Sequence, residues 1–72
     1  MKEQLIKHLR SVPFQPFAIQ MSDGREYAVR HPENLALSKH FAIFADPDQD
    51  VSVDLYLLHI TSIKTDLKPI EP

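Results

Sequence analysis

The chain has 72 residues, no cysteine and a formal net charge of −2, from eight Lys and Arg against ten Asp and Glu. This length predicts one domain, over residues 1–64, of a size at which a single core barely outweighs the chain entropy of folding. The absence of cysteine excludes disulfides and thiolate metal sites, and the acidic balance argues against a strongly basic nucleic-acid-binding surface.

Residues 2–11 predict a short amphipathic helix, in which Leu5, Ile6 and Leu9 form one apolar stripe. Pro13 ends it. An isolated helix of this length is marginal in water, so we expect it to lie against the open end of the sheet that follows.

Residues 14–33 predict a β-hairpin that turns at Asp23 and Gly24. Apolar residues alternate on both sides of the turn: Phe17, Ile19 and Met21 before it, Tyr27 and Val29 after it. A two-residue loop would set Ile19 opposite Ala28 and mix apolar with polar residues on one face. A three-residue loop over residues 22–24, with Gly24 left-handed, pairs Ile19 with Tyr27. We predict the second register, because a slip of one residue turns every side chain to the other face.

The remainder predicts a kink at residues 32–34, followed over residues 35–37 by a short strand or a continuation of the second one. Further strands are predicted over residues 41–45, from residue 51 onward and, last and short, over residues 59–63. Residues 41–45 are apolar at odd and even positions alike, which indicates that other elements cover both faces of this strand. Val53, Leu55 and Leu57 mark one face of the strand from residue 51. The opposite face becomes apolar at Tyr56, Leu58 and Ile60. Such a strand bends round a barrel corner, lies under the helix or pairs with another chain.

A helix followed by about five short antiparallel strands is the element order of a small SH3-like or Sm-like barrel, mainly β. Closing the sheet also removes its edges. Residues 65–72, with two prolines, predict a flexible C-terminal tail. No stretch approaches the ~20 apolar residues of a membrane span and residues 1–11 lack the apolar run of a signal peptide, so we expect a cytoplasmic protein with no membrane partner.

Four motifs are shared with a family of short, uncharacterised bacterial proteins of planctomycete type: Phe14-Gln15-Pro16-Phe17, Ser22-Asp23-Gly24-Arg25, Val29-Arg30-His31-Pro32-Glu33 and Leu58-His59-Ile60. The chain resembles that family over most of its length. The resemblance implies no particular function.

The order of helix, Val12-Pro13, a strand ending at Asp23-Gly24 and a late segment over residues 56–61 is similar to that of bacterial Sm-like RNA chaperones of the host-factor type. In that family a Lys-His pair before the last strand lines a ring pore and contacts uridine-rich RNA. Leu58 stands where the lysine would be, so the resemblance implies a contact role for His59 alone. The glycine typical of the second Sm strand is also absent.

Metal sites receive little support from the spacing. Asp46, Asp48, Asp50 and Asp54 alternate as in a calcium loop, but Val51 and Leu57 stand where an EF-hand needs Gly and Glu, which indicates a solvated turn. His31, Glu33 and His40 offer imidazole and carboxylate groups, yet nothing in their spacing requires a metal. We therefore expect no metal site and no cofactor.

The function favoured is a non-enzymatic interaction or assembly module, binding a protein partner or itself through Tyr56, Leu58 and Ile60. The alternative for these three residues is burial under the helix. A second hypothesis is a single-stranded RNA-binding oligomer with Arg30, His31, Lys39 and His59 as contacts and aromatic side chains as stacking faces. Metal binding comes third. Ser38 with His40, and His59 with Thr61, are close only in sequence, so catalysis is not expected.

Overall fold

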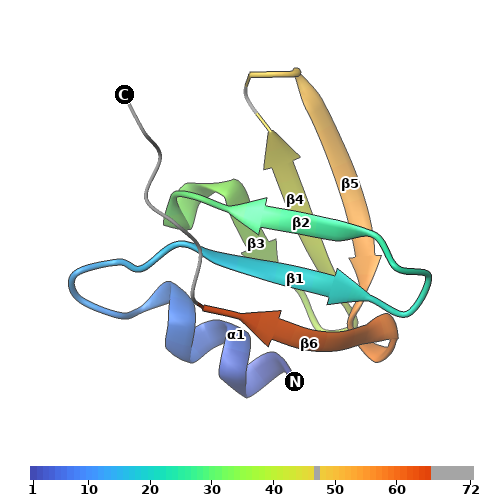
Figure 1. Cartoon of the computed structure of the whole chain (residues 1–72), viewed down its shortest axis with the longest axis horizontal. Coiled ribbons are helices and arrows are strands. Elements are labelled where there is room, and N and C mark those ends of the chain that lie inside the picture. The colour runs from blue at the N-terminus through green and yellow to red at the C-terminus, as the bar shows by residue number, and fades with distance from the viewer. Residues whose placement is uncertain (47, 66–72) are drawn as a thin grey trace.

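The computed structural model describes residues 1–46 and 48–65. Helix α1 (Lys2–Leu9) is followed by β1 (Phe17–Met21), β2 (Glu26–Val29), the 3-10 turn η1 (Pro32–Asn34), β3 (Leu35–Leu37), β4 (Phe41–Asp46), β5 (Val51–Tyr56), the 3-10 turn η2 (Leu57–His59) and β6 (Ile60–Lys64). The strands form two antiparallel sheets, in the orders β2-β1-β6 and β3-β4-β5 (Figure 1). The fold is therefore mainly β with one N-terminal helix, as predicted. These ladders do not join the two sheets into a closed barrel. Beyond Thr65, the expected tail lies outside the described residues.

The β1–β2 hairpin has the predicted register, in which Ile19 lies opposite Tyr27. Its turn is closed by the Met21 N–H, which donates to the Arg25 carbonyl at 2.8 Å, and by the Gly24 N–H, which donates to the Met21 carbonyl at 3.0 Å. Gly24 has φ of 90°, a conformation that L side chains disfavour. The three-residue loop is thus confirmed.

The predicted kink after β2 is a 3-10 turn that carries the chain from one sheet to the other. The His31 N–H donates to Asn34 Oδ1 and the Asn34 N–H donates to the His31 carbonyl, both at 3.0 Å. Asn34 is only 8% exposed, and these bonds satisfy polar groups that the turn would otherwise bury unpaired.

A second 3-10 turn, η2, interrupts the segment that was expected to continue as a strand. Ile60 follows it and is only 7% exposed, whereas Tyr56 is 55% and Leu58 is 96% exposed. A 3-10 turn completes a rotation in three residues, so it resets the two-residue alternation of a strand. The predicted apolar face of Tyr56, Leu58 and Ile60 is therefore wrong for Ile60, which belongs to the core.

Strand β4 is covered on one face only, contrary to the prediction for residues 41–45. Ala42 is fully buried and Phe44 is half-buried, while Ile43 is 40% exposed and Ala45 is exposed. Ile43 lies opposite Asp54 on the outer face of the β3-β4-β5 sheet. Apolar residues at both parities thus mark an exposed apolar patch here rather than a strand covered on both sides.

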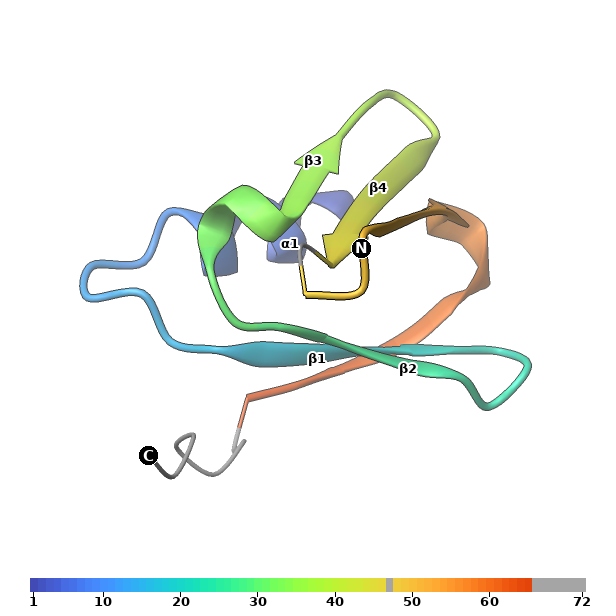
Figure 2. The same ribbon diagram turned by 90° about the horizontal axis from the view of Figure 1, so that it is seen from above.

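The core lies between the two sheets and is closed by α1. Leu5, Phe17, Ile19 and Val29 are its largest fully buried side chains, each worth about 1.5–3 kcal/mol when buried. Figure 2 shows α1 on the same side of β1 as β3 and β4, and the ring of His8 lies 5.2 Å from that of Phe17. The helix ends two residues earlier than predicted.

Within the described residues, no helix has the length and apolarity needed to cross a membrane.

Candidate interaction surface

An exposed apolar surface lies where β4, β5 and η2 meet. We call it the η2 patch and define it as Phe41, Ile43, Tyr56, Leu58 and His59. Phe41 lies directly opposite Tyr56 in the β4–β5 ladder, so both side chains share the outer face with Ile43. Leu58 projects from the 3-10 turn and is 96% exposed. The patch is thus built from a cross-strand pair and a turn that presents a leucine to solvent.

Three rings of the patch form a short row of tilted contacts. The ring centroids of Phe41 and Tyr56 are 4.7 Å apart, with the ring planes inclined by 48°. The imidazole of His59 lies 5.8 Å from the Tyr56 ring at 53°. These separations fall in the range of favourable aromatic pairs, so neighbouring rings hold Tyr56 in place while half of its surface remains open.

Backbone hydrogen bonds from three turns fix the position of the patch. The Leu57 N–H donates to the His40 carbonyl at 3.0 Å, and the Ser22 N–H of the first hairpin donates to the His59 carbonyl at 2.8 Å. The Ser38 N–H donates to the Phe41 carbonyl at 2.8 Å and closes the β3–β4 turn. Consequently backbone hydrogen bonds anchor the patch to the neighbouring turns at η2 and before β4.

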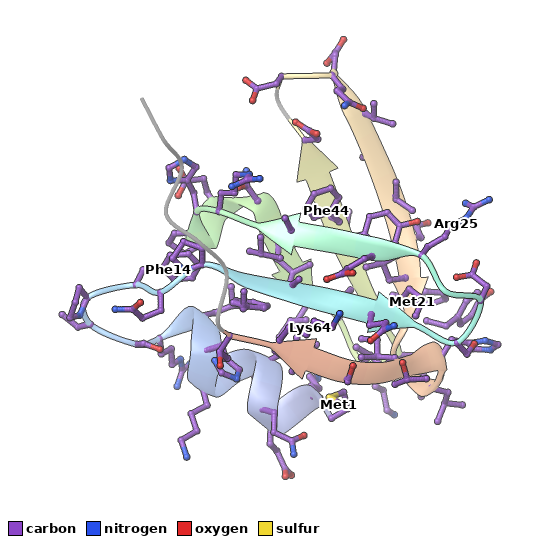
Figure 3. All side chains as sticks on the ribbon, viewed as in Figure 1. Met1, Phe14, Met21, Arg25, Phe44 and Lys64 are labelled. Atoms are coloured by element: carbon purple, nitrogen blue, oxygen red, sulfur yellow. The ribbon has the colours of Figure 1, made fainter. Side chains whose placement is uncertain are left out.

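A cavity of about 220 Å³ adjoins the patch beside the first hairpin turn. Tyr56 and His59 line it together with three charged residues, Asp23, Arg25 and Asp54. Arg25 Nε lies 3.6 Å from Asp23 Oδ2, and Figure 3 shows Arg25 at the end of the hairpin near Met21. The Tyr27 hydroxyl and then the Asp23 carboxylate raise the pKa of Arg25, which stays charged. Two carboxylates against one guanidinium leave this cavity without a positive excess.

The four residues predicted to contact nucleic acid do not form one groove. Lys39 precedes β4 and His59 belongs to the η2 patch, at one end of the molecule. Arg30 and His31 instead line a cavity with Asp46, at the far end of β4. The six residues of β4 span roughly 17 Å at ~3.3 Å per residue. The structure therefore divides these side chains between two surfaces.

The structure does not bring together the residues that the sequence offered as metal ligands either. Among residues 1–46 and 48–65, no group of three His, Asp or Glu side chains is placed to hold an ion. His31 caps η1, whereas His40 lies in the turn before β4. Asp46 accepts the Asp48 N–H at 3.0 Å through Oδ1, as in the solvated turn that the sequence predicted.

Sequence reasoning missed Ile43 as a member of the exposed surface. A usable signal was present, because Phe41 and Ile43 share a parity and Asp54, a residue that rarely faces a core, pairs with Ile43.

Comparison with protein-family models, with curated proteins and with solved structures finds no significant match.

Proposed function

We propose that the protein is a non-enzymatic assembly module that binds a second protein surface, in the simplest case another copy of itself, through the η2 patch. The observation that carries this proposal is the pair of Leu58, 96% exposed, and Tyr56, 55% exposed, beside turns that backbone hydrogen bonds hold together. Exposed apolar side chains that lie together mark interaction sites, and aromatic residues are enriched in them. A small core that benefits from further burial gives the chain a reason to associate.

The hydroxyl groups near histidines support a non-enzymatic role. Ser38 Oγ donates to the Phe41 carbonyl at 3.3 Å, and Thr61 Oγ1 donates to the Gln20 carbonyl at 3.0 Å. A nucleophilic hydroxyl instead needs a base within hydrogen-bond reach. Both hydroxyls are occupied by backbone carbonyls, which favours binding over catalysis.

For the architecture, we propose that the two sheets are the halves of a small open barrel of SH3-like or Sm-like type. In this interpretation, β2 and β3 are two parts of one bent strand that passes from one sheet to the other through η1. In the same way, β5 and β6 are two parts of a second bent strand that passes through η2. The bonds from Ser22 to His59 and from Leu57 to His40 link the halves at the η2 end.

Sedimentation of the purified protein tests the assembly proposal. We expect the wild-type chain to sediment as a dimer or a larger oligomer, and Leu58→Glu to sediment as a monomer. Val12→Glu is a matched control, because Val12 is equally apolar and 95% exposed but lies before β1, outside the η2 patch. A monomeric wild-type chain, or dissociation caused equally by both substitutions, would contradict self-assembly through the patch.

A second candidate function is the binding of single-stranded RNA at the same end of the molecule. The exposed ring of Tyr56, held between Phe41 and His59, favours it, since bases stack on such rings. Lys39 and His40 lie in the turn before β4 and offer phosphate contacts. The resemblance to Sm-like RNA chaperones supports the same choice through His59. Fluorescence anisotropy with labelled oligouridine at two salt concentrations tests it, because phosphate contacts weaken as salt rises.

A further inference from the structure

Strand β2 presents one open edge. In the described part of the chain it pairs with β1 alone. Hydrogen-bonded and non-hydrogen-bonded pairs alternate along an antiparallel ladder. The bond from the Met21 N–H to the Arg25 carbonyl makes that pair hydrogen-bonded, so Tyr27 and Val29 also bond to β1. Glu26 and Ala28 therefore direct their N–H and C=O groups away from β1, toward the open edge.

A groove runs along this edge, at the opposite end of β4 from the η2 patch. It consists of two adjoining cavities, of about 190 and 320 Å³, that share Ala28, Arg30, Phe44 and Asp46. We call it the β2 groove and define it by these four residues. Figure 3 shows Phe44 beside β2, on the side away from β1. The edge with free backbone groups is thus one wall of a groove.

The other wall is the inner face of the β4–β5 ladder, which continues past the core. Phe44 lies opposite Val53, and the next inward pair is Asp46 with Val51. Val51 is 45% exposed although it faces inward. In Figure 1 the β4–β5 hairpin extends beyond β2, so this apolar end has no strand of the other sheet over it. The position is one that an additional strand paired to β2 would cover.

The charges around the groove favour a basic occupant. Asp46 and Asp48 line the smaller cavity with Arg30, and Glu33 and Asp50 line a third cavity that shares Asp46 with it. Glu26 is already paired, at 3.6 Å, with Lys64. Four carboxylates, one guanidinium and the imidazole of His31 therefore line these two cavities.

We propose that the β2 groove binds an extended basic peptide by strand addition. The peptide backbone pairs with Glu26 and Ala28, and the peptide side chains of one parity face the β4–β5 wall. Apolar side chains of that parity cover Phe44, Val51 and Val53, and a Lys or Arg side chain of the same parity, nearer one end of the peptide, reaches Asp46 and its neighbours. Main-chain bonds supply affinity and alternate side chains supply specificity in this mode of recognition. It is a second binding surface, independent of the assembly proposed for the η2 patch.

Amide hydrogen exchange with the synthetic heptapeptide Lys-Thr-Val-Thr-Val-Thr-Lys, in which the lysines share the parity of the valines, tests the proposal. In the free protein, the amide protons of Glu26 and Ala28 should exchange quickly and those of Tyr27 and Val29 slowly. Saturating peptide should protect Glu26 and Ala28 by tenfold or more. The same heptapeptide with glutamate in place of both lysines should bind more weakly. One with proline at its central position should protect Glu26 and Ala28 less, because its backbone has one N–H fewer to donate to the carbonyls of the β2 edge.

Two variants separate the backbone and charge contributions. Ala28→Pro removes an N–H that β1 does not use, so it should leave the protein folded and abolish protection of Glu26 by the peptide. Asp46→Asn should weaken peptide binding about two- to fivefold, as expected for one partly exposed ion pair. Asp54→Asn is the matched control: it removes a carboxylate from the same sheet outside the β2 groove, and should leave peptide affinity unchanged.

Several results would overturn the proposal. Peptide binding without protection of Ala28 places the ligand elsewhere. Protection of Ala28 in the free protein means that the chain itself already occupies the edge, and protection that grows with protein concentration means that a second copy does. Equal affinity for the acidic and basic peptides removes the argument from charge.

Discussion

Ile19 and Tyr27 lie directly opposite each other across the β1–β2 ladder, with Gly24 closing the turn between their strands at φ of 90°. Ile19 is fully buried and Tyr27 packs against the core at its margin, where its ring lies 5.4 Å from that of Phe44. This pair sets the face that the hairpin buries. It also sets which backbone groups of β2 point outward, so the β2 groove depends on the same register.

Replacing Gly24 by alanine should destabilise the protein through backbone conformation alone. A Cβ added at Gly24 meets no atom within 4 Å, so no clash contributes. The left-handed conformation costs an L residue about 1–2 kcal/mol, and we expect that loss in the free energy of unfolding from urea titration. Gly24→Asn should lose less, because asparagine tolerates this conformation better. Equal stability of Gly24→Ala and the wild type would mean that Gly24 does not hold the turn.

Ile60 and Leu58 should respond oppositely to the same truncation. Ile60→Ala empties a core position and should cost about 2–5 kcal/mol of unfolding free energy. Leu58→Ala should change the stability of the monomer by less than about 0.5 kcal/mol, since the side chain is 96% exposed. Thermal unfolding at low micromolar concentration separates this effect from assembly. Similar losses at both positions would contradict the resetting of the strand alternation by η2.

If the η2 patch binds single-stranded RNA, the ring of Tyr56 should matter more than its hydroxyl. Tyr56→Ala removes a stacking surface and should weaken oligouridine binding by ~1–3 kcal/mol, whereas Tyr56→Phe should retain most of the affinity. Fluorescence anisotropy measures both. Equal affinities of Tyr56→Ala and the wild type for oligouridine would exclude the Tyr56 ring from the RNA-binding surface.

Local chemistry made much of this fold predictable. The Asp23-Gly24 turn and the alternation around it determined the hairpin and its register, and the spacing of Leu5 and Leu9 determined the helix. Two features were missed because they depend on tertiary structure: the 3-10 turn η2 and the exposed outer face of β4. A 3-10 turn at Leu57 has no composition that distinguishes it from a strand, yet it moved Ile60 from the expected surface into the core.

The surfaces were less predictable than the fold. The sequence left open whether Tyr56 and Leu58 are exposed or lie under the helix, and both are exposed. Arg30 and Lys39 were expected together as RNA contacts and lie at opposite ends of β4. Residues brought together by the path of the chain between two sheets leave no spacing in the sequence. The β2 groove was missed for the same reason, since its walls come from β2 and from the end of the β4–β5 ladder.

Assembly through the η2 patch, as proposed, makes the environment of the patch depend on protein concentration. Amide chemical shifts recorded on serial dilution, from millimolar to micromolar protein, measure this dependence residue by residue. We predict that the concentration-dependent shifts cluster at Ile43, Tyr56, Leu58 and their neighbours in the patch, and that they vanish in Leu58→Glu but persist in Val12→Glu. Shifts that do not change with concentration, or that cluster away from η2, would contradict the claim.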